Sequence, residues 1–240
     1  MQYPLGEQKA LMKPKELLVG RLASILAPHL LEKHGFRFSR SVPAFSRTVK
    51  PFKQSISFSI SRYSADNNCI FWTMWSVTSR DYARWHQETW GNKPPNDALV
   101  GCADWNIDGW SRSAEDHFTL TNSSSDENTI DELLENVETR GIPFLDRMSS
   151  WERAAEQFLS EQSMFDRAAD FYLIADNRVA AREALLEGIR TFEVEGRPDN
   201  GGELPVLKQR IEQLFPTSAP TTDTQIGIGE RLAAPPSHTT

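Results

Sequence analysis

The chain has 240 residues, of which 39% are hydrophobic and 25% are charged, and its formal net charge is −7. These proportions are typical of a folded globular protein and exclude an intrinsically disordered chain. No apolar run reaches the ~18 residues of a membrane helix, and the first residues lack the apolar core of a signal peptide. We therefore expect a soluble cytoplasmic protein that does not enter a membrane, with Cys69 and Cys102 as buried, reduced thiols.

The charge is unevenly distributed along the chain. Residues 1–77 carry eleven Lys/Arg and four Asp/Glu, a balance of +7, whereas residues 78–240 carry fifteen and twenty-nine, a balance of −14. This polarity indicates either a charged partner or two oppositely charged parts that neutralise each other within the molecule.

The first predicted element is an amphipathic helix that begins near Pro14 and ends at Gly35. Proline is tolerated in the first turn of a helix, and a glycine after the last turn suits a left-handed cap over which Phe36 can pack. Pro28 should kink this helix or split it in two. Its apolar stripe recurs at helical spacing and consists of Leu18, Leu22, Ile25, Leu26 and Leu30.

Strands follow the helix. Between Phe52 and Ser61 apolar residues alternate with serines, which predicts a strand with one dry face and one wet face. The next strand, residues 69–77, is apolar on both faces, so it should be central or covered twice. We expect Trp72 and Trp75 of this strand to be core residues.

The rest of the chain is predicted to be mostly helical. Residues 80–90 favour a short helix or a structured crossover, and weak strand patterns occur near 99–105 and 117–121. A further helix has a capping-box pattern at Thr129 and Glu132 and should end at Gly141. Helical stripes continue to Phe215, and the last ones consist of Val179, Leu185, Leu186 and Ile189, then Val206, Leu207, Ile211, Leu214 and Phe215.

These elements predict an α+β fold with a small antiparallel sheet, packed helices, a helical C-terminal extension and a disordered tail. We expect the α+β domain over residues 13–150. The helical extension should occupy 151–215, either packed on that domain or forming a small subdomain. The Thr- and Pro-rich residues 216–240 predict the disordered tail.

The run from Leu22 to Phe36 resembles the opening helix and glycine–phenylalanine signature of the bacterial DUF4304 domains of unknown function. Phe45-Ser46-Arg47, the serine-rich strand and Phe71-Trp72 are similar to successive strands of that family, and residues 141–145 resemble its C-terminal helix entry. The resemblance covers roughly residues 15–160. It implies an α+β domain without established catalytic residues, and some relatives look like immunity proteins of bacterial toxin systems.

One acidic loop has the spacing of a calcium-binding loop. Asp104, Asn106 and Asp108 occupy positions 1, 3 and 5, and Glu115 stands at position 12. The flanking sequence lacks the two helices of an EF-hand, so an acidic turn held by Asx hydrogen bonds is the alternative. These four residues support the second functional hypothesis, a ligand- or metal-binding protein, with calcium as its cofactor and an enzymatic role left open.

Tryptophans and acidic residues supply the candidate partner-binding surface. Six of the seven tryptophans lie between Trp72 and Trp110, and tryptophan is favoured both in binding hot spots and in cores. The candidate residues are Trp85, Trp90, Trp105, Trp110, Asp126, Glu127, Asp131, Glu135 and Glu138.

A basic stretch interleaves cations with aromatic residues. It contains Arg37, Arg40, Arg47, Lys50 and Lys53. Such a stretch suits single-stranded nucleic acid, an acidic protein, or an edge strand protected by positive charge. The acidity of the whole chain makes nucleic acid the less favoured partner.

Catalytic motifs are absent from the sequence. It has no metal-ligand spacing among its histidines, no phosphate-binding loop, no serine elbow and no paired cysteines. His86 near Asp81 and Glu88, or His117 near Asp116, is the remaining acid/base candidate, against the alternative of surface histidines. The leading hypothesis is therefore a non-catalytic module that binds another protein, and the resemblance implies an immunity protein as its particular form.

Overall fold

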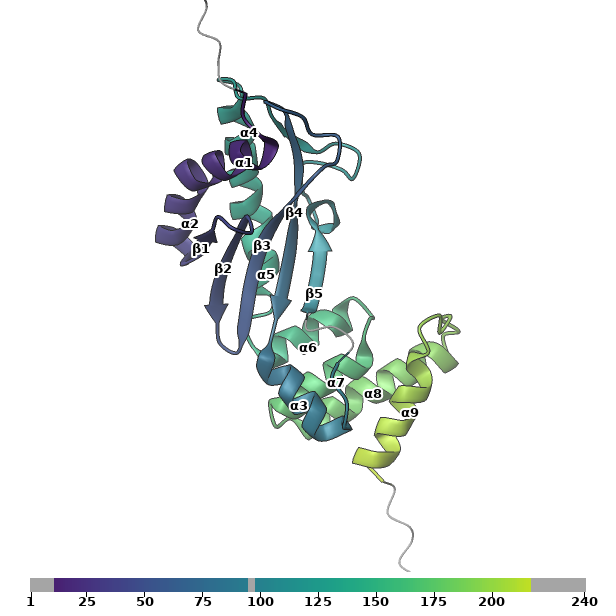
Figure 1. Cartoon of the computed structure of the whole chain (residues 1–240). Coiled ribbons are helices and arrows are strands. Elements are labelled where there is room, and N and C mark those ends of the chain that lie inside the picture. Colours follow the sequence, from purple (N-terminus) through teal and green to yellow (C-terminus); the bar gives the residue numbers. More distant parts are fainter. Residues whose placement is uncertain (1–10, 95–97, 217–240) are drawn as a thin grey trace, which may run out of the picture.

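The computed structural model describes residues 11–94 and 98–216 (Figure 1). Within these ranges, an antiparallel sheet carries helices on one face and a helical extension at one end. This α+β architecture confirms the predicted fold class. The predicted disordered tail lies outside the described residues, apart from Pro216.

The described part of the chain contains helices and strands in the following order. The first part contains α1 (Pro14–Arg21), the π-helical turn η1 (Leu22–Leu26), α2 (Ala27–His34), β1 (Arg37–Ser39), β2 (Ala44–Val49), β3 (Phe52–Ile60), β4 (Cys69–Thr78) and α3 (Arg80–Trp90). The second part contains β5 (Ala98–Ala103), the 3-10 turn η2 (Asp104–Asn106), β6 (Phe118–Leu120), α4 (Asp126–Asn136), the π-helical turn η3 (Val137–Gly141), α5 (Ile142–Asp146), α6 (Trp151–Ser160), α7 (Phe165–Ile174), α8 (Arg178–Glu193) and α9 (Glu203–Leu214).

The described strands form one sheet in the order β1-β2-β3-β4-β5. β4 pairs with β3 on one side and with both β5 and β6 on the other, so it is central, as predicted. The register sets Trp72 opposite Ser59 and Met74 opposite Ser57. Because side chains alternate along a strand, Trp72 and Met74 share a face with the serines of β3.

On one side of β4, Thr73 lies between the residues that pair with β5 and those that pair with β6 and has no strand partner there among the described residues. The side chain of Asp104 takes the place of that partner. The Asp104 carboxylate accepts hydrogen bonds from the backbone N–H of Thr73 at 2.7 Å and from its hydroxyl at 2.9 Å. Burial raises the pKa of Asp104, while these hydrogen bonds oppose that rise. A buried side chain thus takes the place of a strand residue in the sheet.

Both π-helical turns lie just before a proline. Pro28 and Pro143 are each the second residue of the α-helix that follows such a turn. A proline ring clashes with the carbonyl four residues earlier, and a wider turn at that point relieves the clash. The helix therefore continues through Pro28 by a change of hydrogen-bond pattern. The prediction that Gly141 ends its helix is wrong for the same reason, because η3 leads directly into α5.

The start of α4 also differs from the prediction. The helix begins at Asp126, so Thr129 and Glu132 lie within it and form no capping box. The cap of α2 is as predicted, since Gly35 has a φ of 72° and the N–H of Phe36 donates to the carbonyl of Leu30 at 3.1 Å.

The hydrophobic core lies on the inner face of the sheet. Alternate residues of β3 and β4 are buried there, and the helices α1, α2, α4 and α5 cover them (Figure 1). The largest fully buried side chains include Phe36, Phe45, Phe52, Phe71, Trp75 and Phe118, packed against Leu17, Leu18, Leu22 and Leu26 of the first helical segment.

The helical extension packs on α3 and on one end of the sheet (Figure 1). Trp151 of α6 lies edge-on to Phe52 at 4.7 Å between ring centroids, and Phe171 of α7 lies 5.2 Å from Tyr82 of α3. The buried core runs continuously from the sheet into this extension. Three residues predicted in its apolar stripes, Val179, Leu186 and Val206, are instead exposed, because their helices turn these positions away from their neighbours.

A buried polar cluster joins α3, α7 and α9. Asp170 accepts hydrogen bonds from the Tyr82 hydroxyl at 3.0 Å and from Trp90 Nε1 at 3.1 Å. Arg210 donates to the same carboxylate at 2.6 Å, and its guanidinium lies 4.5 Å from the centre of the Trp90 ring. Burial raises the pKa of Asp170 to about 7, and the positive charge of Arg210 opposes the rise.

Candidate functional site

The outer face of the sheet is the candidate binding surface. Ile70, Trp72 and Met74 of β4 lie on this face and are half-buried, whereas Trp75 on the inner face is fully buried. In Figure 1 the helices that cover the core lie on the opposite side of the sheet. Trp75 is a core residue, as predicted, but the same prediction for Trp72 is wrong, because the register places it on the serine-rich face.

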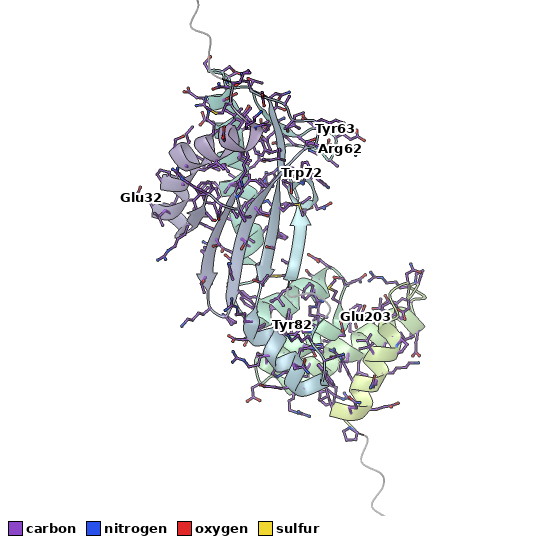
Figure 2. All side chains as sticks on the ribbon, viewed as in Figure 1. Glu32, Arg62, Tyr63, Trp72, Tyr82 and Glu203 are labelled. Atoms are coloured by element: carbon purple, nitrogen blue, oxygen red, sulfur yellow. The ribbon has the colours of Figure 1, made fainter. Side chains whose placement is uncertain are left out.

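A hollow of about 770 Å³ opens at one end of this face, beside the turn that joins β3 to β4. Its floor is formed by Ile70, Trp72 and Thr119, and its walls by residues 61–63 and 115–117. Figure 2 shows Trp72 of the floor together with Arg62 and Tyr63 of the first wall, far from the C-terminal helices. We call this hollow the sheet groove.

Aromatic rings surround the sheet groove. The ring centroids of Trp72 and His117 are 4.9 Å apart, and Trp105 lies 5.7 Å from His117 and 6.1 Å from Trp72. On the first wall, Tyr63 is 71% exposed. Arg62 lies 4.9 Å from the Tyr63 ring centroid and donates to its hydroxyl at 2.8 Å. Tryptophan, tyrosine and arginine are the residue types that supply most binding hot spots.

Neither predicted acid/base pair is present among the described residues. His86 is buried, and its Nδ1 lies 2.9 Å from the carbonyl oxygen of Asn92. His117 packs against two tryptophans, Trp72 and Trp105, while Asp116 accepts a hydrogen bond from Arg112 at 3.2 Å. A general base is normally oriented by a hydrogen-bonded partner, and neither histidine has a carboxylate in that role.

The thiols do not supply a nucleophile either. Cys69 and Cys102 are both free, as predicted, and Cys69 is buried, but Cys102 is only half-buried, which differs from the prediction. Burial raises the pKa of Cys69 to about 12 and that of Cys102 to about 11. Both side chains therefore remain protonated at neutral pH, and the reactive thiolate form is scarce.

The loop with calcium-like spacing does not assemble into a ligand set. Asp104 is 3% exposed, and its oxygens accept hydrogen bonds from Thr73 and from the N–H of Trp105. Asn106, Asp108 and Glu115 are exposed. Across residues 11–94 and 98–216, no group of three or more His, Cys, Asp or Glu side chains could hold a metal ion. The residues do not fit the metal-binding hypothesis.

Three of the four candidate tryptophans lie away from the sheet groove. Trp110 is 9% exposed and packs edge-on to Trp75 at 5.7 Å. Trp85 and Trp90 both lie on α3, with ring centroids 6.3 Å apart, and Trp90 belongs to the buried polar cluster. These contacts give the three residues structural roles. Trp105 is the candidate that borders the groove.

The candidate acidic residues divide into two kinds. Glu127, Asp131 and Glu135 recur every four residues and form an exposed acidic stripe on α4. Asp126 is 1% exposed and accepts a hydrogen bond from the Thr121 N–H at 2.7 Å, so it holds the entry to α4. Because α4 packs on the inner face of the sheet, the stripe and the sheet groove lie on different sides of the molecule (Figure 1).

Glu138, the last candidate acidic residue, joins η3 to α2. Its carboxylate accepts hydrogen bonds from Lys33 at 2.8 Å, from His29 at 2.7 Å and from His34 at 2.8 Å. Burial alone would raise the pKa of Glu138, but these hydrogen bonds outweigh it and hold the pKa at about 2.

We expect Glu138→Gln to lower the free energy of unfolding at pH 7 by about 2 kcal/mol, because charge-assisted hydrogen bonds are lost. A carboxylate whose pKa is lowered on folding stabilises the protein above its ordinary pKa of 4.5 and loses that contribution as the pH falls towards 2. Urea denaturation at pH 7 and pH 3 should therefore show a difference between wild type and variant that shrinks at the lower pH. If the free energies of unfolding of wild type and variant differed by the same amount at pH 7 and pH 3, the lowered pKa of Glu138 would be contradicted.

The candidate basic residues are distributed over two strands and two turns. Arg37 pairs with Ser46 near the middle of β2 and lines one pocket with Arg47, whereas Arg40 lies in the turn before β2, and Lys50 and Lys53 lie at or next to the turn that joins β2 to β3. Arg47 is engaged within the fold, since it lies 4.7 Å from the Phe36 ring centroid and forms an ion pair with Asp146. The predicted basic patch remains a prediction, of which the structure brings Arg37 and Arg47 together.

Sequence reasoning missed Arg62 and Tyr63 and misplaced Trp72. The serines of β3 could have indicated the position of Trp72. They mark the solvent-facing side of that strand, and a residue of β4 that pairs directly opposite one of them lies on the same side of the sheet. The pairing itself is a tertiary contact, so the alternation within β4 did not show which of its two apolar faces would be open.

A scan against models of known protein families, and searches of curated proteins and of solved structures, found no match to this chain. The resemblance to DUF4304 domains therefore remains a prediction. Among the described residues, no helix combines the length and the apolar character needed to cross a bilayer.

Proposed function

We propose that this protein is a non-catalytic interaction module that binds a partner protein in the sheet groove. The observation that carries the proposal is the grouping of Arg62, Tyr63 and Trp72 around a hollow of about 770 Å³ on the outer face of the sheet. Aromatic and arginine anchors beside a recess are typical of the centre of a protein interface. The histidine and cysteine contacts described above favour binding over catalysis.

Neutralisation of a bacterial toxin, implied by the resemblance to DUF4304 domains, is the particular form of this function that we propose. An inhibitor of this kind needs a surface complementary to the toxin and no catalytic group. The net charge of the chain, −7, favours a basic partner.

Tyr63→Ala and Trp72→Ala should each weaken partner binding by about thirty-fold, the effect of removing one hot-spot side chain. Tyr63 is largely exposed, so its removal leaves the core intact. Leu31→Ala is the matched control, because Leu31 is 54% exposed on α2, away from the groove.

The measurement compares proteins captured from the native cell by wild type and by the three variants, followed by titration calorimetry with the purified partner. A partner retained by wild type and Leu31→Ala but lost with the two groove variants supports the proposal. Equal retention by all four proteins overturns it. For a captured toxin, co-expression with wild type should restore growth and co-expression with Trp72→Ala should not.

A further inference from the structure

Of the three charged side chains that line the sheet groove, Arg62 and Asp116 are hydrogen-bonded to other side chains of the described residues and Glu115 is not. Arg62 donates to Tyr63 and lies over its ring, and Asp116 is paired with Arg112 at 3.2 Å. The carboxylate of Glu115 is exposed and has no hydrogen bond or ion pair to any side chain in the described parts of the chain. Neither Arg62 nor Glu115 has a counter-ion among the described side chains, but Arg62 is held by Tyr63, so Glu115 is the charged group of the groove that no other described side chain engages.

That charge stands in the same hollow as an aromatic floor. Trp72 lies on the floor, with the ring of His117 beside it at 4.9 Å, and Glu115 is on the wall that also carries His117. Tryptophan is the aromatic ring that attracts cations most strongly, and a nearby carboxylate adds a direct charge interaction. A positively charged group in the groove would meet both at once.

We propose that the sheet groove binds an arginine side chain of the partner, stacked on Trp72 with Glu115 as its counter-ion. This inference rests on the proposed function and names the chemistry that the groove recognises. Arginine fits better than lysine because its planar guanidinium stacks on a ring while donating two parallel hydrogen bonds to one carboxylate. Within the same groove, the guanidinium of Arg62 already lies over an aromatic ring, that of Tyr63.

An anionic ligand fits the groove less well. Arg62 already donates to the Tyr63 hydroxyl, and the acidic side chains at positions 115 and 116 would repel a phosphate or carboxylate. The net charge of the chain, −7, acts in the same direction at longer range. These charges disfavour nucleic acid and favour a cationic segment of a protein.

The test uses the full chain labelled with ¹⁵N and two acetylated, amidated tripeptides, Gly-Arg-Gly and Gly-citrulline-Gly. Citrulline has nearly the shape of arginine without its charge. The arginine peptide should shift the indole N–H signal of Trp72 in a saturable manner, and the shift should weaken at high salt. The citrulline peptide should leave that signal unchanged.

Variants separate the two contributions. Glu115→Gln should weaken binding of the arginine peptide about threefold, as expected for one exposed ion pair. Trp72→Ala should abolish binding, and because this variant lacks the indole signal, its binding is followed at the backbone N–H signals of Glu115 and His117. Glu127→Gln is the matched control, because Glu127 is an exposed carboxylate on the acidic stripe of α4, and it should bind the peptide as wild type does.

The inference is overturned if both peptides shift the Trp72 signal equally, if neither does, or if Glu115→Gln binds like Glu127→Gln. Its failure is distinguishable from failure of the proposed function. Partner capture that is lost with Trp72→Ala, together with a negative peptide experiment, would leave the groove as a protein-binding site and reject the arginine. Partner capture that is unaffected by Trp72→Ala would reject both.

Discussion

Replacement of Gly141 by alanine is expected to lower the free energy of unfolding by about 3 kcal/mol, although alanine is ordinarily the better helix former. A Cβ atom at this position would overlap the six-membered ring of Trp75. The ring cannot easily retreat, because Trp75 is fully buried and its Nε1 donates to the hydroxyl of Thr73 at 2.8 Å. Urea denaturation followed by circular dichroism measures the effect.

Gly20→Ala provides the matched control. Gly20 is also helical, and a Cβ atom there would meet nothing within 4 Å. We expect this variant to be more stable than wild type by about 0.5–1 kcal/mol, the ordinary difference between glycine and alanine in a helix. In a Trp75→Leu background, Gly141→Ala should cost much less than it does alone. A wild-type denaturation midpoint for Gly141→Ala would show that Trp75 does not restrict this position.

The second large effect concerns the buried polar cluster. Arg210→Met should lower the free energy of unfolding by about 3–5 kcal/mol, because it removes one partner of a buried ion pair and leaves Asp170 without a cation. Both side chains are buried, with exposures of 7% and 0%, so water cannot replace the lost contact. Arg190→Met on α8 is the matched control, since Arg190 pairs with Glu187 at the exposed surface and its loss should change stability little.

The same variant should change the dependence of stability on pH. A carboxylate with a raised pKa in the folded state keeps a proton that the unfolded chain releases. The free energy of unfolding therefore falls as the pH rises from 3.8, the ordinary pKa of the Asp170 carboxyl, to about 7, its pKa in the folded protein. Without Arg210 the pKa of Asp170 rises further, and the fall should continue above pH 7. Thermal unfolding at pH 6 and pH 8 should thus show a larger deficit for Arg210→Met at pH 8.

A double variant tests the cause. Asp170→Asn combined with Arg210→Met removes both charges. The amide oxygen can accept the hydrogen bond from Trp90 Nε1, and the amide NH2 can donate to the Tyr82 hydroxyl oxygen in place of the present bond. The double variant should recover much of the stability lost in Arg210→Met and should show no excess loss at pH 8. A double variant as unstable as the single one would indicate that packing of the Arg210 side chain, and not its charge, holds α9 in place.

Local patterns in the sequence were sufficient wherever an element is defined by its own residues. The left-handed cap at Gly35, the helix over residues 80–90 and the central position of β4 all follow from backbone preferences or from the alternation of apolar residues. The free thiols and the α+β class were predicted in the same way. These features depend on neighbours that are close along the chain.

The errors share a different origin. The helix through Gly141 continues because a π-helical turn accommodates Pro143, and glycine is required there by a ring more than sixty residues earlier in the chain. Asp104 and Asp126 looked like surface carboxylates, yet each completes a backbone hydrogen-bond pattern in the interior. In each case the partner is brought close by folding and not by sequence spacing.

The sequence by itself determined the class of fold, the order of the elements and the acidic balance that favours a cationic partner, because these depend on composition and local periodicity. The tertiary structure decided which apolar face of β4 is open, since that depends on pairing Trp72 with Ser59. It also brought the turn at Arg62 and Tyr63 to the loop at Glu115 and His117, because β6 pairs with β4 beside that turn. The candidate site exists only where these distant segments meet.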